Sequence, residues 1–326
     1  MSTSAKTPAV ETSMSLRTWA MLGLLSLMWG CSFPFVKVAL GGVTPLTLVM
    51  LRVVIAVAAL TPVLFFSREG FPRGAKIWTA FLAIGALNNV VPWSLSVWAQ
   101  QSLTSSLAAI INATTPLFSV LLAHFFLADE RLRANRLAGV LVGFVGVAVL
   151  IGPGALGAGA GGILPELALL AAAVAYAFGG IVGRSYVRLG LTPLQSAHGQ
   201  LAASSIMITP LALVVEKPWT QPMPNNVQIA CVLAMGLVST AVAFILFFRI
   251  LARAGATNAL LVTLLVPVTA FVVSAIFLGE TLEPRNFVGL AFIAAGLGLI
   301  DGRPLRYVQD RLLAARGSDA SARRLD

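Results

Sequence analysis

The chain contains ten apolar runs, most of them about as long as the hydrocarbon core of a bilayer is thick, and they constrain its fold more than any other feature. Cut at Gly, Pro and clusters of charge, the sequence predicts helices near 18–39, 45–66, 77–98, 103–127, 135–151, 164–186, 193–215, 228–249, 257–278 and 286–301. With 58% hydrophobic and only 10% charged residues, the chain is too apolar for an ordinary water-soluble domain. We therefore expect an all-α membrane protein with ten transmembrane helices.

The basic residues indicate how these helices are oriented. If the N-terminus is cytoplasmic, most of the 22 Lys and Arg residues fall in cytoplasmic loops and tails, and the exceptions are Lys37, Arg52, Lys217 and Arg285. This bias predicts a multi-pass protein of the cytoplasmic (inner or plasma) membrane with both termini in the cytoplasm. The net charge of +10 is spread over short loops, so it predicts no nucleic-acid partner.

The second half of the chain repeats the first. Thr44-Pro45-Leu46 recurs as Thr192-Pro193-Leu194, and Thr61-Pro62 recurs at the same spacing as Thr209-Pro210. Five helices are an odd number, so the second copy enters the membrane from the opposite side, which gives two inverted five-helix repeats. The predicted organisation is a disordered cytoplasmic N-terminus (1–15), a first repeat (16–151), a Gly-rich extracytoplasmic linker (152–163), a second repeat (164–302) and a basic cytoplasmic tail (303–326).

Several short motifs resemble a known family. They are Trp29-Gly-x-Ser-Phe-x-x-x-Lys37, the Thr-Pro-Leu that follows it, Arg52, and the segment ends Phe126–Glu130 and Phe277–Glu280. Together they resemble the EamA repeats of the drug/metabolite transporter superfamily. The resemblance implies a two-EamA-domain permease that is similar to exporters of amino acids and other small metabolites. The second repeat departs from the motif, because Ala177, Phe178 and Ser185 replace Trp29, Gly30 and Lys37.

In carriers built from inverted repeats, the solute site lies near the bilayer midplane between the repeats. Aromatic and polar residues near the middle of the predicted helices are therefore candidates for solute binding: Trp29, Asn88, Asn89, Trp93, Asn112, Tyr176, Thr240, Phe244 and Thr263. The polar members have an alternative role, since Asn, Ser and Thr also join helices in membranes by hydrogen bonds.

Charges and prolines within the spans are candidates for gating. Arg52 either snorkels outward, lines the cavity or caps carbonyl groups at a kink, and Lys37 lies near the outer interface. We favour a structural or gating role for both cations over direct contact with solute. Pro34, Pro116 and Pro267 are possible points of bending.

The expected activity is export of small metabolites by alternating access, with a small-molecule solute and the lipid bilayer as partners and no metal or cofactor. No Asp or Glu lies in the middle of a predicted helix, and coupling to protons through His198 is a weaker alternative. A drug or lipid-conjugate efflux carrier is a second possibility. A membrane enzyme or scaffold is disfavoured, because the sequence carries no catalytic motif. The oligomeric state is undetermined, and a monomer fits the sequence.

Overall fold

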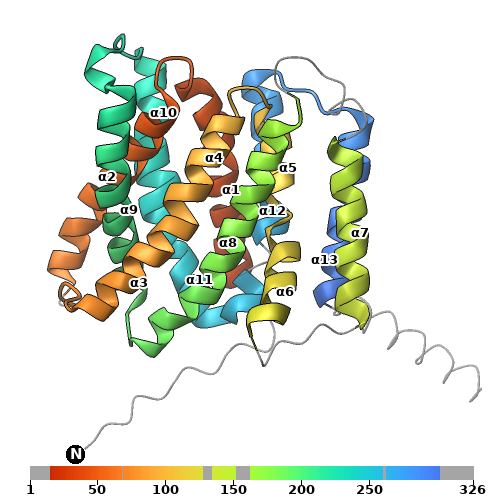
Figure 1. Cartoon of the computed structure of the whole chain (residues 1–326), viewed down its shortest axis with the longest axis horizontal. Helices are drawn as coiled ribbons and strands as arrows, with labels where there is room; N and C mark the ends of the chain where they lie inside the picture. Colours follow the sequence, from red (N-terminus) through yellow and green to blue (C-terminus); the bar gives the residue numbers. More distant parts are fainter. Residues whose placement is uncertain (1–14, 68, 128–133, 152–161, 260–261, 302–326) are drawn as a thin grey trace, which may run out of the picture.

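The computed structural model describes residues 15–67, 69–127, 134–151, 162–259 and 262–301, and these residues form a bundle of helices (Figure 1). The first half contains α1 (Leu16–Ala39), α2 (Pro45–Phe66), α3 (Ala75–Gly85), η1 (Ala86–Val90), α4 (Val91–Ala99), α5 (Ser105–Asn112), α6 (Thr115–Phe126) and α7 (Ala134–Ile151). The second half contains α8 (Leu164–Arg188), α9 (Pro193–Glu216), η3 (Pro218–Thr220), α10 (Asn226–Gly236), η4 (Leu237–Val242), α11 (Ala243–Ala259), α12 (Val262–Leu278) and α13 (Pro284–Asp301). The predicted N-terminal and C-terminal tails and most of the predicted linker lie outside the described residues.

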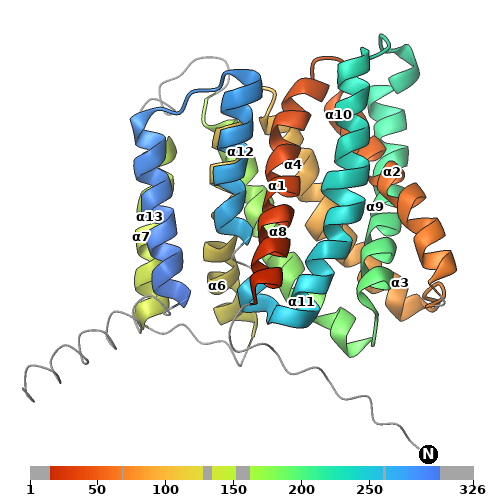
Figure 2. The ribbon, with the colours of Figure 1, turned by 180° about the vertical axis from the view of Figure 1, so that it is seen from behind.

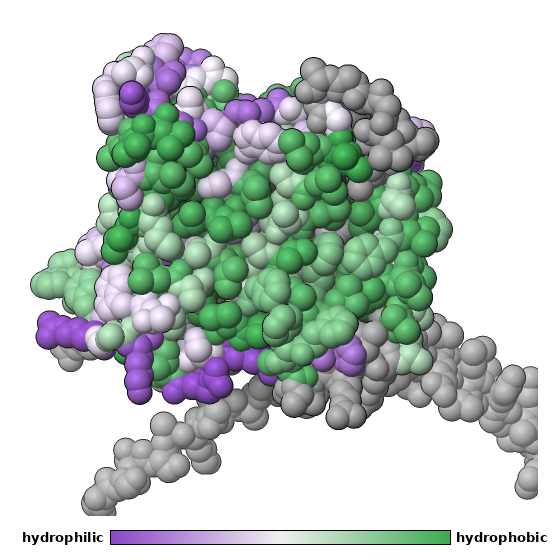
Figure 3. Space-filling model, viewed as in Figure 1, coloured by the Kyte–Doolittle hydropathy of each residue, from purple (hydrophilic) through white to green (hydrophobic). Residues whose placement is uncertain are grey.

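Among the described residues, seven helical stretches are long and apolar enough to cross a membrane, and three shorter apolar helices accompany them. The short ones are Leu137–Leu150, Leu265–Leu278 and Pro284–Ile300. Large apolar side chains such as Phe65, Val214 and Ile276 are exposed on the outside of the bundle. The visible face shows an apolar band between two polar rims, as expected for a surface in contact with lipid (Figure 3).

The fourth predicted helix is broken in two near its middle, which differs from the single helix expected from the sequence. The break between α5 and α6 follows from Pro116, which has no N–H to donate to the carbonyl of Asn112. The Thr115 hydroxyl donates to that carbonyl instead, at 2.8 Å, and the Thr114 hydroxyl donates to the Ile111 carbonyl at 2.7 Å. These hydroxyls let the backbone break at membrane depth without an unsatisfied carbonyl.

Two π-helical segments occur at matching places in the two halves. The segment η1 separates α3 from α4 and contains Asn88 and Asn89, and η4 separates α10 from α11 and contains Ser239 and Thr240. Downstream of η1, Pro92 cannot donate to the carbonyl four residues before it, which favours a change of helical pitch. Such π segments commonly re-aim side chains at functional sites.

The helices α7 and α13 pack against each other at one edge of the bundle (Figures 1 and 2). A Cβ on Gly139 would lie 2.5 Å from the Gly296 carbonyl oxygen, and a Cβ on Gly146 would lie 2.7 Å from that of Gly289. The crossed pairing shows that the two helices run antiparallel, with the same small-residue face on each. Close approach of two backbones through glycines is a common basis of helix association in lipid.

Three carboxylates connect the end of one helix to the beginning of another. Glu216, at the end of α9, accepts hydrogen bonds from the backbone N–H groups of Leu46 and Thr47 at the start of α2. Glu280, just after α12, accepts them from Ser105 and Ser106 at the start of α5, at 2.8 and 2.9 Å. In each case an anion satisfies free N–H groups at the positive end of a helix.

The third carboxylate makes a similar connection in the other direction. Glu69, just after α2, accepts a hydrogen bond from the hydroxyl of Thr192, the residue that precedes α9. Each of α2 and α9 is therefore tied at its start by a carboxylate that lies at the end of the other helix or just after it. This reciprocity matches the repeated Thr-Pro-Leu motif at the beginning of both helices.

The boundary between the eighth and ninth predicted helices was misplaced. The sequence predicted an end near 249 and a new start at 257, whereas α11 continues to Ala259 and α12 begins at Val262. Arg249 and Arg253 lie at and just beyond the predicted end of the span, and both side chains are exposed, so the helix extends past them without burying charge.

The contact between α7 and α13 gives a first prediction. Replacing Gly139 by Ala places a methyl group against the Gly296 carbonyl, and we expect a loss of about 1–3 kcal/mol of stability from overpacking. Thermal unfolding of the detergent-solubilised protein measures the change. Gly23→Ala is the matched control, because a Cβ there meets nothing within 4 Å. Equal unfolding midpoints for the two variants would contradict the close packing.

The Glu280 contact gives a second prediction. Burial raises the pKa of this carboxyl, but the hydrogen bonds from Ser106 and Ser105 outweigh that effect and hold the pKa below its ordinary value. The stabilisation is therefore present at neutral pH and is lost as the pH falls through the lowered pKa. Glu280→Gln should cost about 1 kcal/mol at pH 7 and less in acid, as measured by unfolding between pH 3 and pH 7. Glu283→Gln, which removes only a surface ion pair with Arg285, serves as control.

Candidate functional site

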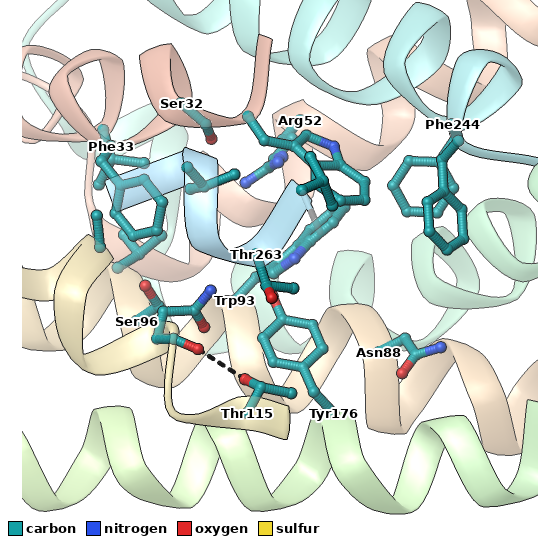
Figure 4. Close-up of a pocket in the computed structure, with 18 of the residues that line it drawn as sticks. Ser32, Phe33, Arg52, Asn88, Trp93, Ser96, Thr115, Tyr176, Phe244 and Thr263 are labelled. Atoms are coloured by element: carbon teal, nitrogen blue, oxygen red, sulfur yellow. Dashed lines mark hydrogen bonds between the residues drawn. The ribbon is translucent and has the colours of Figure 1, made fainter. Parts of the chain in front are cut away.

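A cavity of about 340 Å³ lies between the two halves of the chain. Its walls come from α1, α2, η1, α4, α5 and α6 of the first half and from α8, α9, α11 and α12 of the second. In Figure 4, Ser32 and Arg52 lie on one side of this space, and Tyr176 and Thr115 lie on the opposite side. The volume is at the lower end of the range typical of small-molecule sites.

Arg52 is the charged residue of the cavity wall among the described residues. Its side chain, carried by α2, is only 8% exposed. The Nε group donates a hydrogen bond to the Thr240 hydroxyl in η4 at 2.8 Å, and the guanidinium carbon lies 3.8 Å from the centre of the Trp93 ring. Stacking on an indole is favourable for a cation in a dry environment. The hydrogen bond and the stacking together hold the guanidinium at the cavity.

A neutral counterpart of this arrangement lies elsewhere in the cavity wall. Gln200 occupies in the second repeat the position of Arg52 in the first, counted from the shared Thr-Pro-Leu motif. Its side-chain amide is 3.5 Å from the Asn89 side chain in η1, and Asn89 also donates to Ser204 at 2.8 Å. Arg52 with η4 and Gln200 with η1 are therefore equivalent contacts, but only the first carries a charge.

Aromatic rings form a continuous wall that begins at Arg52. Trp93 packs edge-on against Phe244, with ring centres 6.3 Å apart, and Phe244 contacts Phe248 at the same distance. Phe248 contacts Phe247, which in turn packs against Trp29, both with ring centres 5.4 Å apart. This aromatic wall crosses from α4 through α11 to α1. It offers a large apolar surface to a bound molecule.

Amide and hydroxyl groups complete the lining. Asn88, Ser96, Gln100, Asn112 and Thr115 all face the cavity. Gln100 donates weakly to the Ser96 carbonyl at 3.3 Å, but its Oε1 atom is buried and has no hydrogen-bond partner in the described part of the chain. An unpartnered buried acceptor of this kind carries a free-energy cost.

The predicted solute-binding residues divide into two groups. Along the cavity wall lie Trp29, Asn88, Trp93, Asn112, Tyr176, Phe244 and Thr263. Asn89 and Thr240 lie behind the wall, fully buried, where they contact Ser204 and Arg52. Both make hydrogen bonds between helices, the kind of contact named as the alternative to solute binding.

The predicted gating residues also separate. Arg52 lines the cavity, whereas Lys37, Pro34, Pro116 and Pro267 are not part of its lining. The Lys37 ammonium donates to the carbonyls of Gln100 and Leu103, each at 2.9 Å, and so joins the end of α1 to the end of α4. Pro116 lies at the start of α6, and Pro34 and Pro267 lie within α1 and α12.

His198 lies outside the cavity lining. Its Nε2 atom is 3.0 Å from the Thr61 hydroxyl, and its ring packs edge-on against Phe71. Among the described residues, no group of three His, Cys, Asp or Glu side chains is placed to hold a metal ion.

Sequence reasoning missed part of the site. Gln100, Gln200, Phe247 and Phe248 line the cavity but were not proposed. A signal for the phenylalanines was present, because Phe244, Phe247 and Phe248 follow the spacing of one helix face. Gln200 could also have been found from the sequence, because it occupies the position in the second repeat that Arg52 occupies in the first.

Comparison with known proteins identifies the two halves separately. The sequence model described as the EamA-like transporter family matches residues 17–152 and again residues 163–300. A probable terminal-alkyne amino-acid exporter of Streptantibioticus cattleyicolor is 28% identical over 90% of this chain and 95% of its own length. A probable amino-acid metabolite efflux pump of Salmonella typhimurium is 26% identical over 87% of this chain and 94% of its own length.

One solved crystal structure is similar in fold. It has a TM-score of 0.63 and 21% sequence identity, and the match covers 88% of this chain and 99% of that chain. The likeness supports the arrangement of helices over nearly the whole of both chains.

The buried Asn89 contact gives a prediction about the site. Ser204→Ala removes the acceptor of a hydrogen bond whose donor is fully buried, so we expect a loss of about 1–3 kcal/mol in stability. Ser205→Ala, at the adjacent and less buried position, should change stability by less than about 0.5 kcal/mol. Unfolding of both variants in the same detergent compares them, and similar losses would argue against a special role for the Asn89 contact.

Proposed function

The chain belongs to the EamA-like transporter family, and on that basis we propose that it exports small organic solutes, amino acids or related metabolites, by alternating access. The solute would occupy the cavity between the two halves. The single observation that carries the proposal is this cavity, whose wall combines residues of both family repeats.

The proposed topology has ten transmembrane helices in two inverted repeats, with both termini in the cytoplasm. The three shorter apolar helices would cross the membrane together with the seven longer ones. The antiparallel glycine contacts of α7 with α13 and the reciprocal carboxylate contacts of α2 with α9 support an inverted relation. The distribution of Lys and Arg supports the orientation in a bacterial inner membrane.

Alternating access needs contacts that close the cavity on each face in turn. On the face that the topology places outside, Lys37 joins α1 to α4 and Glu280 joins the end of α12 to α5. On the cytoplasmic face, Glu69 joins the end of α2 to Thr192. These contacts consist of a few hydrogen bonds each, so they can break and re-form. The break between α5 and α6 provides a place for the helix to bend.

The size of the cavity favours a single small solute over a lipid conjugate, because about 340 Å³ is near the minimum for a small-molecule site. The names of the two exporters described above support amino acids or their derivatives as the class to test first. Drug efflux remains the second candidate, favoured by the aromatic wall.

Two glycines of α8 allow a sharp test. A Cβ on either Gly180 or Gly183 meets nothing within 4 Å, but only Gly180 lines the cavity. Gly180→Leu should project its side chain into the cavity and reduce solute efflux at least tenfold while the protein still folds, because the Cβ displaces no packed neighbour. Gly183→Leu should retain efflux near the wild-type rate.

Efflux is measured from proteoliposomes preloaded with a mixture of radiolabelled amino acids, after a resistance screen with toxic analogues has selected the mixture. The proposal would be overturned if the wild-type protein moved none of the selected solutes. Equal efflux by Gly180→Leu and the wild type would show that solute takes another route.

A further inference from the structure

Arg52 is a buried cation with no opposite charge beside it among the described residues. Its side chain is 8% exposed, and within the described residues no Asp or Glu carboxylate lies within ion-pair distance of the guanidinium. A charge at membrane depth is costly, and proteins usually pair it or use it. The residues that line the cavity include no Asp or Glu in the described part of the chain. A positively charged solute would therefore meet repulsion here.

Most of the hydrogen-bonding capacity of the guanidinium is left over. An arginine carries five N–H donors, and the contact with Thr240 uses the one on Nε. The two terminal Nη groups make no hydrogen bond to a described residue, and Arg52 lines the cavity. A planar pair of N–H groups matches the two oxygens of a carboxylate.

The equivalent contact of the other repeat indicates that the charge is not needed for packing. There Gln200 and Asn89 make the same connection between helices with neutral amides. Because a neutral side chain suffices for the structural role, the positive charge at position 52 points to an additional role. A bound anion would supply the missing counter-charge.

The residues around Arg52 indicate which other groups a bound solute would carry. The aromatic wall begins at the indole on which Arg52 stacks and extends to Trp29, so an apolar group attached to the anion would lie against rings. One cation balances one negative charge, which favours a monocarboxylate over a phosphate dianion.

We propose that the cavity selects solutes that carry a carboxylate and an apolar body, with Arg52 as the residue that binds the carboxylate. Thr240 acts as a positioning residue, because it fixes the guanidinium through Nε. The inference rests on the proposed function of the cavity as the solute site, and it revises the gating role that the sequence favoured for Arg52.

The test compares two probes of nearly identical shape, 3-phenyllactate and its neutral amide 3-phenyllactamide. Binding to the purified full-length protein is measured in detergent at fixed ionic strength by calorimetry. The wild type should bind the carboxylate at least tenfold more tightly than the amide. Arg52→Gln should remove this preference while binding the amide as well as before. Arg52→Lys should retain part of the preference, because it keeps the charge but loses the planar pair of donors.

Two further variants separate folding from recognition. Thr240→Val leaves the charge in place but frees the guanidinium, so the preference for the carboxylate should fall severalfold and the affinity for the amide should not. Lys76→Gln removes an exposed cation outside the cavity lining and should change neither affinity. Unfolding midpoints are measured for all variants, and Arg52→Lys replaces Arg52→Gln as the decisive variant if the latter does not fold.

The outcomes distinguish this inference from the proposed function. Equal affinity of the wild type for both probes, or a preference that survives in Arg52→Gln, overturns the carboxylate site, and so does a failure of the wild type to bind either probe. Efflux of neutral solutes from proteoliposomes would then still support a carrier. Conversely, carboxylate binding that depends on Arg52 without efflux of any solute supports the site and contradicts the proposed transport.

Discussion

In the core of a bilayer there is no water to hydrogen-bond a backbone N–H or carbonyl group, so each such group needs a partner within the protein. The rest of this structure depends on that constraint. The described chain meets it with helices almost everywhere. The interruptions are few, and local groups satisfy each of them: the hydroxyls of Thr114 and Thr115 at the break before α6, and π-type hydrogen bonding in η1 and η4. The α5–α6 break and η1 each contribute lining residues, and η4 holds Arg52, which lines the cavity. The irregular backbone is thus placed where a cavity requires it.

The same constraint explains the connections between helices. Glu216 and Glu280 bind the free N–H groups at the beginning of α2 and α5, so the positive ends of these helices are covered by anions of the other half of the chain. The glycine contacts hold α7 against α13 by close packing of the two backbones. Such packing is needed because lipid provides no hydrophobic driving force between helices.

Repetition and divergence have different effects on the site. The duplicated framework places position 52 against η4 and position 200 against η1, which produces two equivalent contacts around one cavity. The residues at these positions differ, Arg in one and Gln in the other, so one contact is charged and the other is neutral. The repeats therefore determine the shape of the cavity, and the substitutions between them determine its polarity. The loss of the Lys37 position in the second repeat follows the same pattern, because Ser185 cannot reach two carbonyls as Lys37 does.

Most helix ends were predictable to within a few residues, because they coincide with prolines such as Pro45, Pro193 and Pro284, which prefer the first turn of a helix. The end of α11 was not, since exposed arginines do not stop a helix. Many cavity residues could also be predicted from the sequence, because amide side chains are costly in the middle of a span and Trp and Tyr are more usual at the membrane interfaces.

The hydrogen-bond partners of those residues could not be predicted from the sequence. Asn88 faces the cavity and Asn89 faces Ser204, yet nothing in the sequence separates two adjacent asparagines, since their directions depend on the π-helical turn that contains them. Run length, the distribution of basic residues and the internal repeat are enough to indicate a helical membrane protein of duplicated design, because each reflects a cost that lipid imposes on any sequence. The role of a given polar side chain depends instead on distances between helices, such as the 2.8 Å that joins Arg52 to Thr240, and those distances arise only when the two halves pack together.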